Sequence, residues 1–168
     1  MNKFIPNMYK KDIFSIDYKK LKKMGIKVLL FDFDNTIIEK GNYKIKEETL
    51  KLFSKLKKEF IVYIVSNSIH AKKIKTISEE LNLPYIGNSG KPFKRGFKKL
   101  KLTDVKSNEI AMIGDQLITD VWGASRMNYF SILVDPINND EWLLTKLNRV
   151  FEKIILKKNK FKRGNYYE

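Results

Sequence analysis

Short apolar runs alternate with amphipathic segments along most of this chain. Runs rich in branched and aromatic residues occupy positions 27–33, 60–66, 84–86, 109–113 and 129–134. Runs of this kind are typical of strands that are buried on both faces of a parallel sheet. Between them, apolar residues recur at helical spacing at 47–58, 71–81, 93–100 and 118–127. The alternation predicts an α/β fold, a Rossmannoid three-layer sandwich around a central parallel sheet.

Polar residues gather where these strands end. The sequence DFDNT (32–36) closes the first run, SNS (66–68) follows the second, and GDQLITD (114–120) follows the fourth. Right-handed crossovers bring the carboxyl ends of parallel strands to one edge of the sheet, where ligands bind in such folds. We therefore expect these segments to meet in one functional site.

The aspartates of these segments have the chemistry of a metal site. Asp32 and Asp34 are two residues apart on an extended segment, so their side chains point to the same side. Neighbouring carboxylates repel and favour a hard cation such as Mg²⁺, although Mn²⁺ suits the same oxygen ligands. A single aspartate at a strand end can instead cap a helix or face water. Together with Asp115 and Asp120, however, the pair predicts a Mg²⁺ site of four aspartates.

In kind and order, these motifs and the KP pair at 91–92 resemble those of the haloacid dehalogenase (HAD) phosphatase superfamily. The resemblance covers nearly the whole chain. It is closer still to the YqeG-like phosphatases of HAD subfamily IIIA, which are related to phosphatidylglycerophosphate phosphatases. It includes VYIVSNS (62–68), IGDQLITDV (113–121) and WLLTKLNRVFEKIILKK (142–158). The resemblance implies a HAD-like fold and a phosphoric monoester hydrolase.

The resemblance also implies catalytic roles. Asp32 corresponds to the nucleophile that forms an aspartyl-phosphate, and Asp34 to the general acid and base. Thr36 would hold Asp34 through a hydrogen bond. Lys91 would neutralise charge on the nucleophile and on the phosphoryl group. Thr36 and Lys91 would both lie among the residues that bind the substrate phosphate.

Further motif residues would bind phosphate and metal. Ser66 and Asn67 would orient phosphate oxygens without adding charge. Asp115 would bind Mg²⁺ directly, beside the nucleophile and the backbone carbonyl of the general acid. Asp120 would hold a metal-bound water or Lys91. A phosphoryl group in transfer carries negative charge, so carboxylates can approach it only where cations offset the repulsion.

The spacing between the motifs bears on the substrate. HAD phosphatases often carry a cap domain that closes over a small substrate. Residues 36–61 leave room for a short flap at 39–44 and one helix, and residues 68–91 for one helix and one short strand. We therefore expect no cap domain and an open site. An open site favours a phosphate that projects from something large, and phosphatidylglycerophosphate is compatible with the resemblance.

Several alternatives remain at this point. A phosphatase of a nucleotide or phosphosugar, or a phosphotransferase, would use the same motifs. An RNA- or ribosome-binding assembly factor on a HAD scaffold would explain the formal net charge of +15. Its affinity would fall steeply with salt and would survive loss of Asp32. The complete catalytic set favours the enzyme.

Charge and cysteine content suggest partners and location. A net charge of +15 points to anionic partners, although lysine-rich drift in an AT-rich genome produces the same excess. The absence of cysteine excludes disulfides and thiolate metal sites and fits a reducing cytoplasm. Apolar runs stay well short of a membrane span. We expect a cytoplasmic protein, and the sequence leaves open whether it also contacts an anionic membrane peripherally at its inner face.

The chain is expected to form one HAD-like domain over residues 1–168, with a core at about 25–136 and a helical segment at 1–24. Within 139–168, apolar residues at helical spacing predict an amphipathic helix at 141–157. That helix would pack on the sheet or lie in a lipid interface. The basic residues after it would bind anionic lipid or RNA, or form a solvated end.

Overall fold

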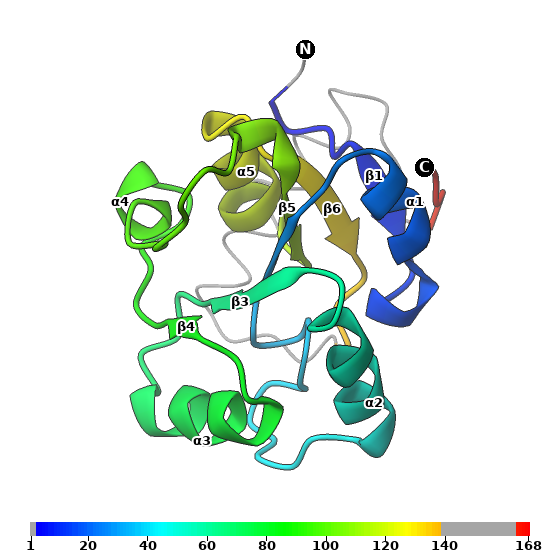
Figure 1. The fold of residues 1–168 in the computed structure, drawn as a ribbon. Coiled ribbons are helices and arrows are strands. Elements are labelled where there is room, and N and C mark those ends of the chain that lie inside the picture. Colours follow the sequence, from blue (N-terminus) through cyan, green and yellow to red (C-terminus); the bar gives the residue numbers. More distant parts are fainter. Residues whose placement is uncertain (1–2, 139–163) are drawn as a thin grey trace.

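The computed structural model describes residues 3–138 and 164–168. A six-stranded sheet lies at its centre, in the strand order β1-β6-β5-β2-β3-β4 (Figure 1). Every neighbouring pair of strands is parallel. The strands are β1 (Met8–Lys10), β2 (Val28–Phe31), β3 (Ile61–Val65), β4 (Tyr85–Ile86), β5 (Ile110–Gly114) and β6 (Phe130–Val134). The five predicted strands are thus confirmed.

Helices and helical turns connect the strands. In chain order they are η1 (Ile13–Ser15), α1 (Tyr18–Lys23), α2 (Glu47–Leu56), α3 (Ala71–Leu81), α4 (Lys94–Phe97), η2 (Ser107–Glu109), the π-helical η3 (Leu117–Trp122) and α5 (Gly123–Arg126). The segment 71–81 is helical over its whole predicted length. The segment 93–100 forms only the single turn α4, and 118–127 is divided between η3 and α5.

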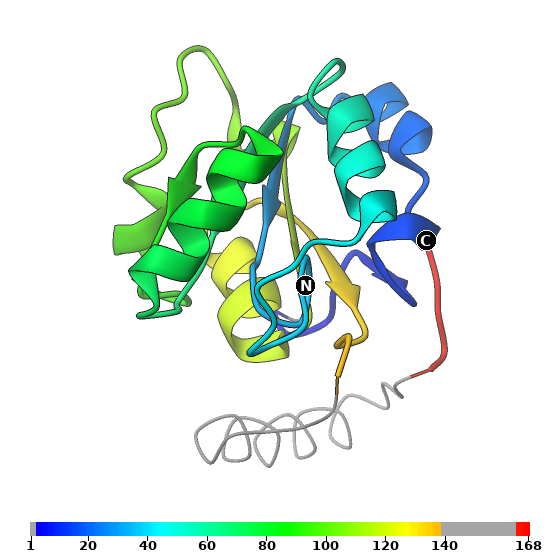
Figure 2. The same ribbon diagram turned by 90° about the horizontal axis from the view of Figure 1, so that it is seen from below.

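Strand β2 shows how the three layers form. All four of its residues are buried, because successive side chains enter opposite layers. Leu29 and Phe31 belong to the apolar cluster that contains side chains of α1, α2 and α3. Val28 and Leu30 belong to the cluster that contains side chains of α4 and α5. Figures 1 and 2 show these helices on the two sides of the sheet, which confirms the predicted three-layer sandwich.

The N-terminal segment differs from the expected helical one, because it also contributes the edge strand β1. Met8 pairs with Ile132 and Tyr9 with Leu133 of β6. Three residues are too few to show an alternating pattern, so only the tertiary partner reveals this strand. Tyr9 also exchanges two backbone hydrogen bonds of 2.9 Å with Tyr167, which places the C-terminal residues beside β1 (Figure 1).

The predicted amphipathic helix at 141–157, and the basic tail as far as residue 163, lie outside the described residues. Residues 164–168 are described and pack on the domain. The Tyr166 hydroxyl donates to Asp135 at 2.6 Å, and the Lys20 ammonium pairs with Glu168 at 2.6 Å. The last residues therefore have partners on the domain, although all of them except Tyr167 are exposed to solvent.

The described chain has no cap domain inserted at the edge that carries the motifs. The connection from β2 to α2 is a loop, and the connection from β3 to β4 contains α3 as its one regular element, so neither holds a cap domain. None of the helices formed by residues 3–138 and 164–168 is long and apolar enough to cross a membrane.

Candidate active site

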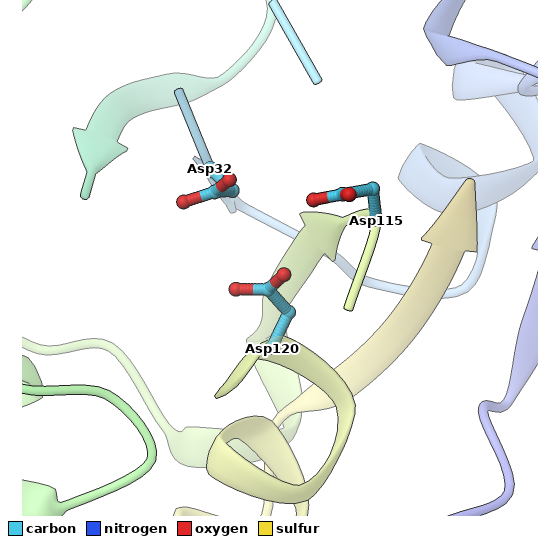
Figure 3. Close-up of side chains that lie close together, drawn as sticks. All are labelled: Asp32, Asp115 and Asp120. Carbon is cyan, nitrogen blue, oxygen red and sulfur yellow. The ribbon is translucent and has the colours of Figure 1, made fainter. Parts of the chain in front are cut away.

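Three buried carboxylates meet at the carboxyl edge of the sheet (Figure 3). Asp32 directly follows β2, Asp115 directly follows β5, and Asp120 lies in η3. One oxygen from each lies within 4.8 Å of the others. Strands β2 and β5 are neighbours in the sheet, and this adjacency brings together residues that are far apart in the sequence.

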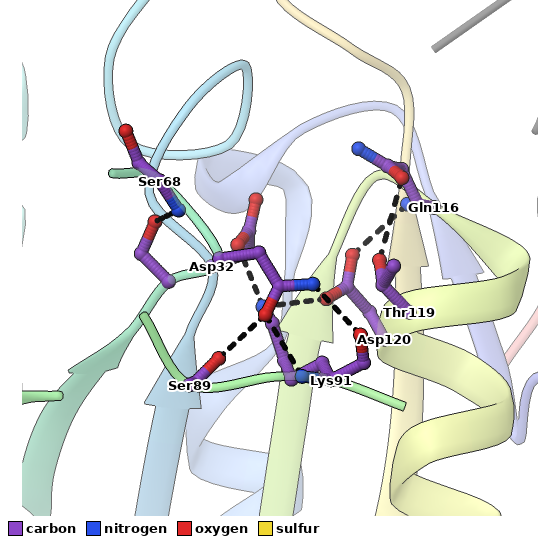
Figure 4. A network of polar contacts seen from close by, with 9 residues as sticks. Asp32, Ser68, Ser89, Lys91, Gln116, Thr119 and Asp120 are labelled. Atoms are coloured by element: carbon purple, nitrogen blue, oxygen red, sulfur yellow. Dashed lines mark hydrogen bonds and ion pairs between the residues drawn. The ribbon is translucent and has the colours of Figure 1, made fainter. Parts of the chain in front are cut away.

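Lys91 connects two of these carboxylates (Figure 4). Its ammonium donates to Asp32 Oδ1 at 2.6 Å and to Asp120 Oδ1 at 2.7 Å, and all three side chains are buried. Burial raises the pKa of the Asp32 carboxyl from 3.8 to about 7, although Lys91 opposes this shift. Burial lowers the pKa of Lys91, but Asp120 and Asp32 outweigh it, so the net shift is upward. Lys91 is therefore held as a cation beside the candidate nucleophile.

Asp120 is fixed from two sides. Besides the contact with Lys91, its Oδ2 accepts from the Gln116 backbone N–H at 3.1 Å. Gly114 makes room for this arrangement, because a Cβ atom there would lie 2.3 Å from the Asp120 carboxylate. The structure thus places Asp120 as a partner of Lys91, which is one of the two roles that the motif implied.

Asn67 holds the loop that carries Lys91. Its amide donates to the Lys91 carbonyl at 2.8 Å, and its Oδ1 accepts from the Lys91 N–H and from the Ser89 hydroxyl, both at 2.8 Å. The side chain predicted to bind phosphate is therefore occupied with positioning Lys91. Ser66 is buried at the end of β3, and its Oγ accepts from the Ser68 N–H at 3.0 Å. In this role the hydroxyl keeps its proton for another acceptor.

Asp34 and Thr36 are not joined as predicted. The Asp34 carboxylate pairs with Lys73 of α3 at 2.8 Å, whereas Thr36 Oγ1 is buried and has no hydrogen-bond partner in the described chain. A charged ammonium is a stronger partner for a carboxylate than a hydroxyl, and Lys73 occupies Oδ1 of Asp34. Among the described residues, Asp34 also stays outside the group of three carboxylates.

Lys73 and Ser89 are site residues that the sequence interpretation missed. The signal for Lys73 was present, since it occupies the same buried face of α3 as Ile74 and Ile77. A lysine on such a face needs a charged partner. Nothing in the sequence indicated that this partner is Asp34.

The donor set suits a hard divalent cation. Carboxylate oxygens within 4.8 Å of one another can share one Mg²⁺ ion, which binds oxygen at about 2.0–2.1 Å. Asp32 and Asp115 would be the direct ligands, with the backbone carbonyl of Asp34 as the further candidate. Each carboxylate oxygen of Asp120 already accepts a hydrogen bond. This fits a residue that supports the site better than a direct ligand of the metal ion.

Two family profiles and a bacterial protein match most of this chain. The profile of the mitochondrial PGP phosphatase family matches residues 1–85, and a HAD-hydrolase-like profile matches residues 88–149. A Bacillus subtilis (strain 168) protein named "Probable phosphatase YqeG" is 35% identical over 155 residues, which cover 91% of this chain and 90% of that protein.

Two more distant proteins extend the comparison. The chloroplastic/mitochondrial phosphatidylglycerophosphate phosphatase 1 of Arabidopsis thaliana is 25% identical over 165 residues, and the match spans 92% of this chain but only 47% of that protein. The magnesium-bound HAD-hydrolase YfnB from Bacillus subtilis superposes with a TM-score of 0.56. That alignment covers 74% of this chain and 98% of YfnB at 14% identity, so it bears on the fold alone.

The fold, the site and these matches define a phosphatase of the HAD class. Within that class, the chain belongs to the YqeG-like family, which the sequence motifs had indicated.

Proposed function

We propose that this phosphatase is a Mg²⁺-dependent phosphomonoester hydrolase that works through an aspartyl-phosphate on Asp32. The observation that carries the proposal is the contact of the buried Lys91 ammonium with Asp32 and Asp120, within a group of carboxylates that can share one cation. A nucleophilic carboxylate can approach a phosphate dianion only in such a cationic setting.

The chain's own residues account for both halves of the reaction. An Asp32 oxygen attacks phosphorus, the bond to the leaving oxygen breaks, and Asp34 gives that oxygen a proton. Asp34 then takes a proton from the water that attacks the aspartyl-phosphate, which releases inorganic phosphate and restores Asp32. Lys91 and the Ser66 hydroxyl stabilise charge on the transferring group. Bound Mg²⁺ would supply further positive charge at the same oxygens.

Mg²⁺ is expected to stabilise the fold through this site. Carboxylates that repel in the free protein would share a cation, so the melting temperature should rise with the logarithm of the Mg²⁺ concentration once that concentration exceeds the dissociation constant. Differential scanning fluorimetry in EDTA and in millimolar Mg²⁺ checks this. Asp115→Asn should abolish the shift, whereas Asp104→Asn, an exposed control, should keep it. A shift that survives in Asp115→Asn would contradict the assigned ligand.

Phosphatidylglycerophosphate is the substrate that we propose. Its terminal phosphate is a monoester on a lipid headgroup. One matching family profile and one matching protein are named for a phosphatase of this lipid. Without a cap domain in the described chain, the edge that carries the site would admit a phosphate that projects from a bilayer.

The surface around the site supports a lipid substrate. The three most exposed large apolar side chains of the described chain are Ile69 (81%), Tyr43 (65%) and Phe93 (62%). They lie in the loops that follow β3, β2 and β4, at the edge that carries the site. The surrounding segments 40–44, 69–76 and 90–101 contain several basic residues and no acidic one. An apolar rim with a basic surround is complementary to an anionic membrane.

Phosphate release from this lipid should exceed release from a soluble ester by orders of magnitude. The assay compares phosphatidylglycerophosphate in mixed vesicles with glycerol phosphate, both with Mg²⁺, and uses Asp32→Asn as the blank. Activity on the soluble ester alone would support the phosphatase activity but contradict the lipid substrate.

The rim provides a matched control for the same assay. Ile69→Ser with Phe93→Ser should lower vesicle binding and lipid turnover at least about tenfold, because each apolar side chain contributes about 1.5–3 kcal/mol when fully buried. Hydrolysis of glycerol phosphate should not change. Met24→Ser with Ile61→Ser removes half-exposed apolar side chains at the opposite edge and should alter neither reaction. Equal losses in the two double variants would contradict the membrane-facing rim.

A further inference from the structure

Lys73 is a buried cation that the known motifs do not use. Its side chain is 3% exposed, on the face of α3 that packs against the sheet. A buried ammonium is costly unless it is paired. Its pair is Asp34 Oδ1 at 2.8 Å, and its Nζ lies 5.1 Å from the ring centroid of Phe33 and 5.6 Å from that of Tyr43. The ammonium is thus enclosed by the loop that directly follows β2 and by the flap at 39–44.

The position of Asp34 relative to the nucleophile suggests a role for the Lys73–Asp34 ion pair. In an in-line displacement, the leaving oxygen lies on the far side of phosphorus from the attacking oxygen. A proton donor to the leaving oxygen must therefore lie away from the group formed by Asp32, Asp115 and Asp120. The Asp34 carboxylate lies outside that group, and Lys73 is the cation that holds it there.

We propose that Lys73 is a positioning residue. Its ammonium donates to Asp34 Oδ1 and holds the carboxyl group where Oδ2 carries the proton that passes to the leaving oxygen. The proposal rests on the hydrolase mechanism proposed above. Because the Lys73 side chain is almost fully buried, it acts through Asp34 and does not touch the substrate. The rings of Phe33 and Tyr43 limit the positions that the ammonium can take, so the carboxylate that it holds is also restricted.

A positioning role and a purely structural role predict different dependence on the leaving group. An alkoxide leaves poorly and needs the proton from Asp34, whereas p-nitrophenolate leaves readily without one. Loss of Lys73 should therefore impair hydrolysis of an alkyl phosphate more than hydrolysis of p-nitrophenyl phosphate. A merely structural loss would lower both equally.

The test compares kcat/KM for glycerol phosphate and p-nitrophenyl phosphate in Lys73→Met. We expect the ratio of the two values to fall by at least about tenfold, since proton transfer contributes about 10²–10⁴-fold. Both esters are assayed on the same preparation, so the ratio is independent of the fraction that is folded. Lys72→Met is the matched control, because Lys72 is exposed on the same helix, and it should leave the ratio unchanged.

A double-mutant cycle tests whether Lys73 acts through Asp34. In an Asp34→Asn background, Lys73→Met should not change the ratio further. An unchanged ratio in the single variant, or a further fall in the double variant, would overturn the positioning role. A wild-type protein with no Asp32-dependent turnover of either ester would instead overturn the hydrolase mechanism, and this role with it.

Discussion

Replacing Asp32 with asparagine is expected to lower kcat for phosphomonoesters by at least about 10⁴-fold, as loss of a catalytic nucleophile does elsewhere. The amide has nearly the same shape but cannot form the acyl phosphate. The measurement is phosphate release under saturating substrate with Mg²⁺. The control is Asp104→Asn, the same substitution at an exposed aspartate, and it should keep wild-type turnover. Residual activity of Asp32→Asn within tenfold of wild type would exclude Asp32 as the nucleophile.

The same variant should fold at least as well as the wild type when metal is removed. Burial raises the Asp32 pKa from 3.8 to about 7, so the folded protein retains a proton that the unfolded chain loses between these pH values. Wild-type stability therefore falls as pH rises through this window, and Asp32→Asn lacks that loss. In EDTA, the melting temperature of Asp32→Asn relative to wild type should rise as pH rises from 3.8 to about 7, and should level off above that pH. A constant difference would contradict the raised pKa.

Replacing Lys91 with methionine should have the second-largest effect, on both stability and activity. It would leave the buried carboxylates of Asp32 and Asp120 without their shared cation. Breaking a buried ion pair from one side costs about 3–5 kcal/mol in unfolding free energy. Loss of a charge-stabilising donor should also lower kcat about 10²–10³-fold for the folded fraction. Urea unfolding in EDTA and phosphate release with Mg²⁺ measure the two effects.

Two further variants separate the Lys91 effect from general damage. Lys94→Met removes an exposed lysine three residues away and should change the unfolding free energy by no more than about 0.5 kcal/mol. Adding Asp120→Asn to Lys91→Met removes one stranded carboxylate and should recover part of the lost stability, but not the activity. A double variant no more stable than Lys91→Met would contradict the charge argument.

Most of the sheet and the candidate aspartates could be predicted from sequence because the signals are local. The run VLLF in β2 is buried on both faces, and an apolar run of that kind cannot remain in water. Asp32 interrupts the pattern directly after it. Strand β1 gave no such signal, since three residues become a strand only by pairing with β6. The π-helical form of η3 was likewise invisible, although Asp120 at its centre was identified.

Side-chain partners within the site depended on distant segments and could not be predicted in the same way. Asn67 follows a strand in the manner of a phosphate ligand, yet its carbonyl oxygen and one amide N–H bind the loop of Ser89 and Lys91. Thr36 is close to Asp34 in sequence, but Lys73 holds the Asp34 carboxylate. In both cases the partner comes from a segment that is distant in the sequence, so the local sequence could not reveal it. That partner is also stronger or better placed than the one predicted.

The sequence by itself indicated most of the candidate site residues, because residue type and strand-end position follow from hydrophobic patterning and from what each functional group can do. It determined that Asp32, Asp115 and Asp120 would share one edge of the sheet. The tertiary structure decided how those groups are paired: that Lys91 connects Asp32 with Asp120, and that Lys73 takes Asp34. The physical reason is that hydrogen bonds and ion pairs extend only about 3 Å, so their partners are fixed only once packing has brought distant segments together.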